Sequence, residues 1–549
     1  MTFDVLISGG LVVDGTGSPM RQADVAVRAD IIAAVGHLKG AAAKREIDAT
    51  GKVVTPGFID AHAHSDVSLY LNPIAESQVA QGITTEIMGN CGYSPFPLVV
   101  HNRGLLLDPP TVPLEWHTAE QYFRRMSEGG MGINAFPQVG HVTVRAAVLH
   151  GEDRPATHEE IERMKQYVRE AMEAGARGLS TGLDYHPSTT SDIEEIVELA
   201  KVVAEYDGIY TSHIRGYSHN VINAVAEALQ VGRRAGVRVQ ISHIGVFGRK
   251  HWGWAQRILD ILEQARRDGI RVACDMMAYP TAGAWWGPRA ILPSWAYDWK
   301  KPWLENLPEL RAKLVDPAVR GRLRAEIEAR RERPKFGFHE EFLIFSDWRD
   351  VFIEELPAGS PRAYLLGMDM VTAAAQEGKD PCDLWFDLVL EEGDELATVH
   401  TAIGPEDFRA FLTDPWTMFG TDAIATAISR LHEPWNAIQP HPRHYGTFPR
   451  VLAKFVRDEG VLDLASAVRR MTGLVADHFG LTRLGYIREG YKADLVVLDL
   501  AQLQERGTWR LPAAYPCGIE HVFVSGMEVV SKGAFTKRLG GRMLTLGSG

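Results

Sequence analysis

Cysteine is scarce in this sequence of 549 residues, which has only Cys91, Cys274, Cys382 and Cys517. Four cysteines make no disulfide framework in a chain of this length, which favours a reducing, cytoplasmic setting. We interpret Cys274, Cys382 and Cys517 as buried apolar side chains. Cys91 needs a separate argument, because it lies in "GNCG" at the end of an apolar run.

Long apolar runs and an excess of basic residues are also missing. No run reaches the roughly 18 residues that cross a bilayer. Asp4 interrupts the opening "MTFDVLISGG" where a signal peptide has its apolar region, so we expect a strand there. The net charge of -12 and the pI of about 5.9 give no electrostatic footprint for nucleic acid or an anionic membrane. We therefore expect a small-molecule partner, no nucleic acid and no membrane; the sequence carries no signal for the oligomeric state.

Short β-type runs occur at both ends of the chain. The chain opens with "DVLISGG", "LVVDGTG", "ADVAVRAD" and "IIAAVG". The same pattern of short apolar runs returns near its end, in "GYIREGYKADLVVLDL" and "IEHVFVSGMEVV". Alternating or continuous apolar runs between glycines are typical of strands. We predict that residues 1–55 and 484–549 together form a small β-sandwich domain, since the chain is too long for a single core.

Between the two ends, strands alternate with helices. For example, Ser191 and Glu194 have the spacing of a capping box at a helix start, and "IYTSHI" then reads as a buried strand. Such alternation favours a parallel sheet with crossover helices. Eight candidate strands predict a (β/α)8 TIM-type barrel over residues 56–483, and they lie at 57–64, 83–91, 132–139, 176–182, 208–214, 237–244, 270–277 and 417–422. A doubly wound open sheet is the alternative, although no glycine-rich phosphate loop follows the first strand.

The segment between the seventh and eighth predicted strands is too long for one crossover. We therefore predict an insertion at residues 285–415. Its first part is rich in tryptophan, with Trp285, Trp286, Trp295, Trp299 and Trp303. These rings either cover a large apolar group of a substrate or form the insertion's own core.

Potential metal ligands stand at the carboxyl ends of five predicted strands, where barrel enzymes place their catalytic groups. They are His62, His64, Cys91, His213, His243 and Asp422. Any one of them could be a core or rim residue, but six on one rim predict a site. Imidazole, thiolate and carboxylate together suit zinc better than magnesium or calcium. We therefore interpret Cys91 as a metal ligand.

Several motifs resemble those of a known family. They are "PGFIDAHAHSD", "GNCGYSP", "STGLDY", two "SHI" strand ends, "GTD", "HPRHYGTFPRVL", "RRMTGLVADHFGL" and "GYIREGYKADLVVLD". Together they look like the amidohydrolase superfamily, and within it like the D-aminoacylases (N-acyl-D-amino-acid deacylases). The resemblance covers most of the chain and is weakest at 100–130 and 285–415. "GNCG" is the most specific motif, because this branch uses cysteine where the superfamily often uses a carboxylated lysine.

The resemblance implies a zinc centre with a bridging thiolate. His62 and His64 would hold one zinc and His213 and His243 the other, with Cys91 between them. In this branch the site formed by the cysteine and the two later histidines is the tight one. We therefore expect one tightly bound zinc, with the ligands for a second.

The resemblance also implies a reaction, the hydrolysis of a linear amide by metal-activated water. Asp422 matches the family's catalytic aspartate and would pass the water's proton to the leaving amine. Tyr185, in "STGLDY", falls where the family has a substrate-contacting tyrosine. The implied substrate is an N-acyl-D-amino acid or a related, bulkier N-acyl amide.

One departure from the family concerns the substrate. Family members often read S-H-H-K on the sixth strand, whereas this chain has Ser242-His243-Ile244-Gly245. The cation expected for an amino-acid carboxylate is therefore missing at Gly245. Arg289, in the tryptophan-rich insertion, is one candidate to replace it, and a plain surface arginine is the other interpretation.

Two other hypotheses about the function remain. The same fold could hydrolyse another C–N bond, in a cyclic amide or a deaminase-type substrate. Superfamily deaminases, however, usually carry a glutamate shortly after a strand histidine, and neither His213 nor His243 is followed by one. The third reading is a non-catalytic scaffold, which would be expected to have lost ligands that this chain keeps.

Overall fold

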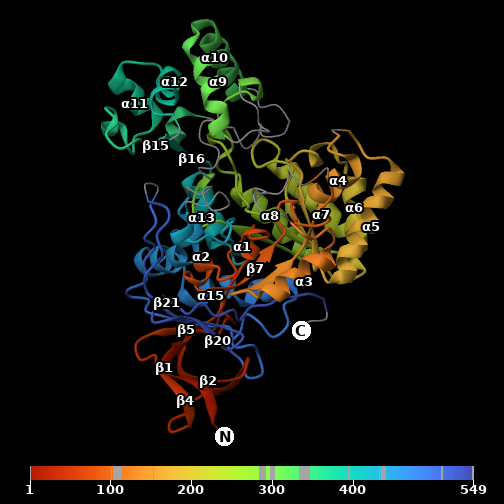
Figure 1. Cartoon of the computed structure of the whole chain (residues 1–549), viewed down its shortest axis with the longest axis vertical. Helices are drawn as coiled ribbons and strands as arrows, with labels where there is room; N and C mark the ends of the chain where they lie inside the picture. The colour runs from red at the N-terminus through yellow and green to blue at the C-terminus, as the bar shows by residue number, and fades with distance from the viewer. Residues whose placement is uncertain are drawn as a thin grey trace.

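The computed structural model is elongated, with a β layer at one end, strands and helices in the middle, and a helical lobe at the other end (Figure 1). The two termini lie toward the same end of the molecule, which the β layer occupies. The structure describes residues 2–100, 102, 114–152, 154–282, 292–296, 303–332, 347–393, 396–431, 433, 441–508 and 511–546.

A nine-stranded sheet forms the β layer from both ends of the chain. Strand β5 joins them, because it pairs in parallel with β1 and antiparallel with β18. Ile7, Val25 and Val497 are fully buried in the core on this sheet. Cys517 is exposed, so the prediction that it is a buried apolar side chain is wrong, whereas Cys274 and Cys382 are buried as predicted. The strands are β1 (Phe3–Val12), β2 (Arg21–Arg28), β3 (Ile31–Gly36), β4 (Ala43–Asp48), β5 (Val53–Pro56), β18 (Leu495–Leu498), β19 (Ile519–Val524), β20 (Met527–Ser531) and β21 (Ala534–Phe535).

The middle of the chain is α/β with parallel sheets. One sheet has the order β6-β7-β8 and the other β17-β13-β12-β11-β10-β9, with every pair parallel. These strands are β6 (Phe58–Asp60), β7 (Ile83–Met88), β8 (Asn134–Pro137), β9 (Val139–Gly140), β10 (Gly178–Gly182), β11 (Ile209–His213), β12 (Arg238–Ile241), β13 (Val272–Met276) and β17 (Thr417–Phe419). The third predicted segment is divided at Gln138 into β8 and β9, and β9 ends one residue beyond it; each of the other strands lies within its predicted segment. Backbone hydrogen bonds also join the ends of β6 and β17, from Ala61 N to Phe419 O at 3.1 Å and from His64 N to Ala423 O at 2.8 Å.

Helices cross over between these strands and cover them. Helix α6 does not begin with the predicted capping box, because the hydroxyl of Ser191 donates to Ser188 O at 2.6 Å. Asp192 is the N-cap instead and accepts from Glu195 N at 2.9 Å. The helices are α1 (Ser68–Leu71), α2 (Glu76–Val79), α3 (Ala119–Gly129), α4 (His141–Leu149), α5 (His158–Ala174), α6 (Ile193–Ala204), α7 (Val221–Ala235), α8 (Ala255–Arg267), α13 (Pro405–Thr413), α14 (Arg443–Arg450), the π-helical η10 (Val451–Asp458), α15 (Leu464–Met471) and α16 (Gly473–Phe479). No helix in the described part of the chain is long and apolar enough to cross a membrane.

The lobe at the top of Figure 1 is formed by elements that lie between β13 and α13 in the chain. It has a hydrophobic core of its own, which includes Leu310, Trp348 and Trp385. Trp295 packs against that core, whereas Trp285, Trp286 and Trp299 lie outside the described residues. Its elements are β14 (Thr281–Ala282), α9 (Trp303–Val315), α10 (Pro317–Glu332), β15 (Val351–Glu355), α11 (Met370–Glu377), α12 (Pro381–Glu391) and β16 (Ala397–Thr401).

Candidate active site

The six candidate ligands meet at the carboxyl ends of the parallel strands. His62 and His64 follow β6, Cys91 follows β7, His213 ends β11, His243 follows β12 and Asp422 follows β17. Five of them are buried, and the Asp422 side chain keeps 17% of its surface exposed. Residues up to 360 positions apart are therefore brought to one place by the alignment of parallel strand ends.

Cys91 lies between two groups of ligand atoms. Its Sγ is 3.4 Å from Nε2 of His62 and 3.3 Å from Nε2 of His243. The first group is His62, His64, Cys91 and Asp422, the second is Cys91, His213 and His243, and within each group the ligand atoms lie within 4.8 Å of one another. The thiol is thus common to two possible metal positions.

Three of these residues have a left-handed backbone. The φ angles are 54° at Cys91, 32° at His243 and 50° at Asp422. A side chain with a Cβ is strained in this region, and such strain persists where the surrounding structure holds it, often at functional sites. The turn at each strand end is what directs these side chains into the cluster.

Charge within the cluster favours a thiolate and a carboxylate. Burial alone would raise the pKa of Cys91, but the charges of His62 and His243 outweigh it and hold that pKa well below its usual range. Burial likewise opposes ionisation of Asp422, yet Arg443 and the hydrogen bond from His64 hold the pKa of its carboxyl well below the ordinary value. Both groups are anionic at neutral pH, which is the form that binds a metal or accepts a proton.

The histidines on the two sides of Cys91 differ in their protonation. Burial lowers the pKa of His213 to about 4, so its ring is neutral at pH 7. Burial also acts against a charge on His64, but its hydrogen bond with Asp422 and its interactions with Cys91 raise its pKa to about 9. A metal on the His213 side therefore meets a neutral imidazole, whereas one on the His64 side must first displace a proton.

Two supporting residues were missed by the sequence analysis. Oδ1 of Asp275 lies 3.4 Å from Nδ1 of His62 and accepts from the backbone N of His243 at 2.8 Å. Nη1 of Arg443 donates to Oδ2 of Asp422 at 2.7 Å. The signals were an acid inside the apolar strand "VACDMM" and the arginine of "HPRHYGTFPRVL". Such partners orient ligands and tune their charge.

Comparison with known proteins places the chain in a family. The model of a family described as "Amidohydrolase family" matches residues 45–328 and 373–530. The chain belongs to the amidohydrolase family. The predicted resemblance to D-aminoacylases is also confirmed. A D-aminoacylase of Alcaligenes xylosoxydans xylosoxydans is 34% identical over 99% of this chain and 97% of its own. An N-acyl-D-glutamate deacylase of the same organism is 33% identical over 96% of this chain and 93% of its own.

Comparison with solved structures agrees with this family assignment. A D-aminoacylase crystal structure aligns with a TM-score of 0.74 and 31% identity, over 99% of this chain and 100% of that one. An N-acyl-D-glutamate deacylase from Bordetella bronchiseptica, complexed with zinc and a phosphonate inhibitor, has a TM-score of 0.74 and 30% identity over the same shares. A D-hydantoinase from Thermus sp., 15% identical with a TM-score of 0.55 over 99% of both chains, shares the fold.

Tyr185 lies beside a candidate ligand of the amidohydrolase cluster. Its ring centroid is 4.4 Å from that of His213 and 5.5 Å from that of Tyr93. Tyr185 is partly exposed, whereas His213 is fully buried. An aromatic side chain in this position can contact a group bound above the histidine.

At the position of the missing lysine, a side chain would collide with two apolar side chains unless they shifted. A Cβ added to Gly245 would lie 2.6 Å from Cε1 of Phe247 and 2.9 Å from Cδ1 of Ile403. The apolar side chains of this amidohydrolase therefore occupy the place where the family lysine would begin. Arg289, one candidate to replace that lysine, lies outside the described residues. The buried cation that the structure does place at the cluster is Arg443, whose Nε has no hydrogen-bond partner among the described residues.

Proposed function

We propose that this amidohydrolase deacylates N-acyl-D-amino acids, releasing a carboxylic acid and the free amino acid. The observation that carries the proposal is the thiol of Cys91, which two pairs of histidines share beside the carboxylate of Asp422. Relatives named D-aminoacylase, N-acyl-D-glutamate deacylase and N-acyl-D-aspartate deacylase, 31 to 34% identical over at least 96% of this chain, support the reaction class.

The donor set fits zinc. Cys91, His213 and His243 would hold the tightly bound ion, because the thiol and the His213 ring have already lost the protons that a metal must displace. His62 and His64 would hold a second ion with Cys91. Bound zinc supplies Lewis-acid activation of water and of the amide carbonyl.

Asp422 would move the proton. Its ionised carboxylate accepts a proton from the attacking water and then gives it to the amine, which cannot leave as an anion. Arg443 and His64 each contact one oxygen of this carboxylate and so fix its orientation. Positioning of this kind is necessary, because proton transfer requires hydrogen-bond reach of the reacting atoms.

Arg443 would also attract the carboxylate of the amino acid. It is a cation of the cluster in a chain that lacks the family lysine at Gly245, and its unpaired Nε is a buried donor there. An unpaired buried donor is costly, and a substrate carboxylate would satisfy it. Tyr185, whose ring lies beside that of His213, would contact the same substrate.

We further infer that the parallel strands close into the predicted (β/α)8 barrel over residues 56–483. The backbone hydrogen bonds between the ends of β6 and β17 support closure. Residues 1–55 with 484–549 would be the small β domain, and 285–415 the insertion, which the separate hydrophobic core around Trp385 supports. Small molecules are the proposed partners of this fold.

The test is hydrolysis of paired N-acetyl-D- and N-acetyl-L-amino acids of methionine, phenylalanine and glutamate, with zinc supplied. We expect release of the D-amino acid at a higher kcat/KM than its L counterpart. Zinc-loaded protein that hydrolyses neither series would contradict the proposal. It would point instead to an amide without a carboxylate.

A further inference from the structure

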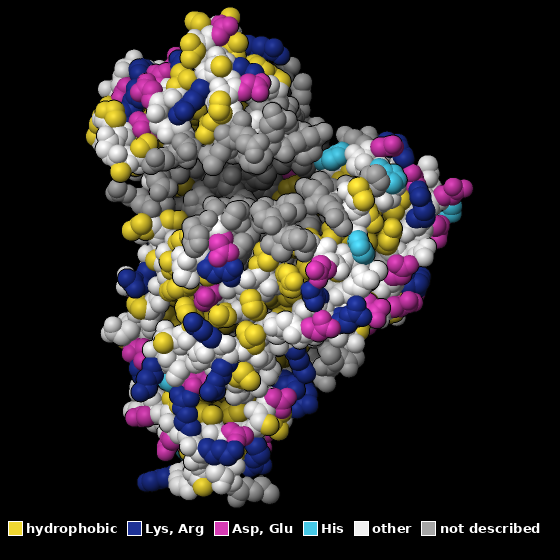
Figure 2. Space-filling view, viewed as in Figure 1, with side chains coloured by type: hydrophobic (Ala, Val, Ile, Leu, Met, Phe, Trp, Pro, Cys, Tyr) yellow, Lys and Arg dark blue, Asp and Glu magenta, His cyan; other side chains and the backbone are white. Residues whose placement is uncertain are grey.

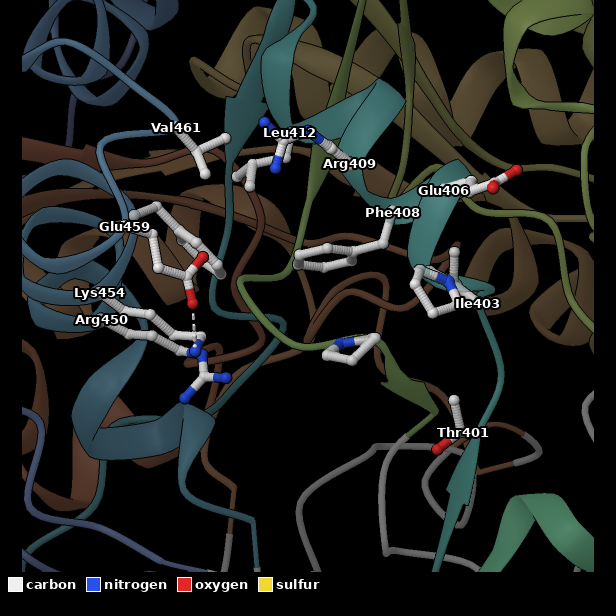
Figure 3. A pocket seen from close by; sticks show the side chains of 13 residues that line it. Thr401, Ile403, Glu406, Phe408, Arg409, Leu412, Arg450, Lys454, Glu459 and Val461 are labelled. Atoms are coloured by element: carbon white, nitrogen blue, oxygen red, sulfur yellow. Dashed lines mark ion pairs between the residues drawn. The ribbon is translucent and has the colours of Figure 1, made fainter.

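A cavity lies outside the ligand cluster, between α13 and the π-helical segment η10 (Figure 3). Its volume is about 420 Å³, which is within the range of small-molecule sites. None of the six candidate metal ligands lines it. Its lining includes the apolar residues Phe408, Leu412, Phe455 and Val461 and the cationic residues Arg409, Arg450 and Lys454.

One wall of the cavity is apolar. The rings of Phe408 from α13 and Phe455 from η10 meet with their centroids 5.9 Å apart. Leu412 and Val461 extend this surface, and Figure 3 shows Phe408 directed toward the middle of the space. Such a wall can bury the hydrocarbon part of a ligand.

Cations border this apolar wall, because Cζ of Arg450 and Nζ of Lys454 lie 5.8 Å and 5.9 Å from the centroid of the Phe455 ring. Arg450 and Lys454 are four residues apart on one continuous helical segment, so their side chains lie on the same face, as Figure 3 shows. The Nη1 atom of Arg450 pairs with Glu505 at 2.8 Å. Arg409 is exposed at the rim, and no ion pair among the described residues includes it. Glu406 and Glu459 also line the cavity, so its charged side chains are three cations and two carboxylates, a balance that favours an anionic ligand.

Lys454 already holds a carboxylate here. Its Nζ lies 2.6 Å from Oε1 of Glu459, and both side chains are more than two-fifths exposed, at 43% and 41%. An exposed pair of this kind contributes little to stability and is readily exchanged. A ligand carboxylate can therefore replace Glu459 at Lys454 while its body lies on the Phe408–Phe455 wall.

We propose that this cavity is a second small-molecule site and that its ligand is a carboxylate with an aliphatic or aryl-alkyl body. The apolar wall favours a ligand with a hydrocarbon body over a bare small anion, and the excess of cations over carboxylates favours a carboxylate over an amine. The site adjoins the helix that carries Arg443, since η10 continues α14. The π-helix is rare in proteins, and where it occurs it often lies at a functional site. Binding can be measured without any hydrolysis, so the proposal does not depend on the proposed activity.

The test is calorimetric titration of the zinc-loaded protein with octanoate, with acetate and octylamine as comparison ligands. We expect saturable binding of octanoate, much weaker binding of acetate and none of octylamine. Lys454→Met should weaken octanoate binding by about tenfold, the effect of one lost charge-assisted hydrogen bond. Val461→Trp should abolish it by filling the cavity from its partly exposed rim. Lys454→Arg should retain binding.

The matched control is Lys165→Met, which removes a lysine of similar pairing, to Glu162 at 2.8 Å, from helix α5. It should bind octanoate as the unaltered protein does. No saturable octanoate binding would overturn the proposal. So would binding that neither Lys454→Met nor Val461→Trp changes, because octanoate would then occupy another place, such as the active site.

Discussion

Arg443 donates from Nη1 to Oδ2 of Asp422 at 2.7 Å, and this contact joins helix α14 to the end of β17. The arginine is buried, so its charge acts on the carboxylate with little screening by water. The pair links the proposed proton-transfer group to the proposed cation for the substrate. It therefore offers two separate tests.

Asp422→Asn should keep the metal and lose turnover. Asparagine has the size of aspartate and tolerates the left-handed φ of 50° at this position, so folding should be preserved. Without a proton acceptor, kcat should fall by about 10²- to 10⁴-fold. Metal analysis and single-turnover kinetics check this. A rate near that of the unaltered enzyme would place the general base elsewhere.

Arg443→Met should move the acidic limb of the kcat/KM profile to higher pH. After the opposing effect of burial, the Arg443 charge is the largest influence on the pKa of Asp422, so removing it raises that pKa and protonates the base over a wider range. We also expect a higher KM for substrates with a free carboxylate and a loss in kcat/KM of about 100-fold. Arg234→Met, which removes an exposed pair with Glu194, is the control and should change neither. An unmoved profile would show that Arg443 does not tune Asp422.

The Cys91→Ala variant should lose both its tightly bound metal and its activity. Cys91 is the ligand common to both groups of donor atoms, so its removal weakens both positions. Cys274→Ala is the matched control, because Cys274 is equally buried but lies outside the cluster, and burial raises the pKa of its thiol to about 12. Normal zinc content and activity in Cys91→Ala would disprove the bridging role.

The two metal positions should release different numbers of protons when zinc binds. At pH 7 the Cys91 thiol and the His213 ring are already deprotonated, whereas His64, with a pKa of about 9, is protonated. Affinity at the His62–His64 position should therefore rise with pH up to about 9, and affinity at the Cys91–His213–His243 position should change less over that range. Calorimetry of zinc binding in buffers of different ionisation enthalpy measures the protons released. Equal proton release by both equivalents of zinc would contradict this account.

Gly245→Lys should not restore a family-type site. The new Cβ would lie 2.6 Å from Phe247 and 2.9 Å from Ile403, so the core must shift at a cost of about 1–3 kcal/mol. Thermal unfolding and D-amino-acid hydrolysis together check this. Gly321→Ala, where a Cβ meets nothing within 4 Å, is the control for a glycine replacement and should not destabilise the protein. A stable Gly245→Lys enzyme with higher activity would show that the position is open to the substrate.

The candidate site was largely predictable because its residues follow strand ends. Apolar runs locate parallel strands, and a histidine, cysteine or aspartate directly after such a run must lie at the carboxyl edge. His62 and Cys91 were found in this way. Local hydrogen bonding was harder to predict, as Ser191 shows: its hydroxyl serves a preceding turn, and Asp192 caps the helix instead.

The sequence by itself determined the family, the order of strands and helices and the six residues at the cluster, because these depend on residue type and spacing. Only the tertiary structure decided that Arg443 meets Asp422, that Asp275 supports His62 and His243, and that Phe247 and Ile403 close the position of Gly245. These contacts join segments distant in the chain, and no local pattern encodes the distance between them. They arise from the packing of strand ends and helices, which only the folded chain brings together.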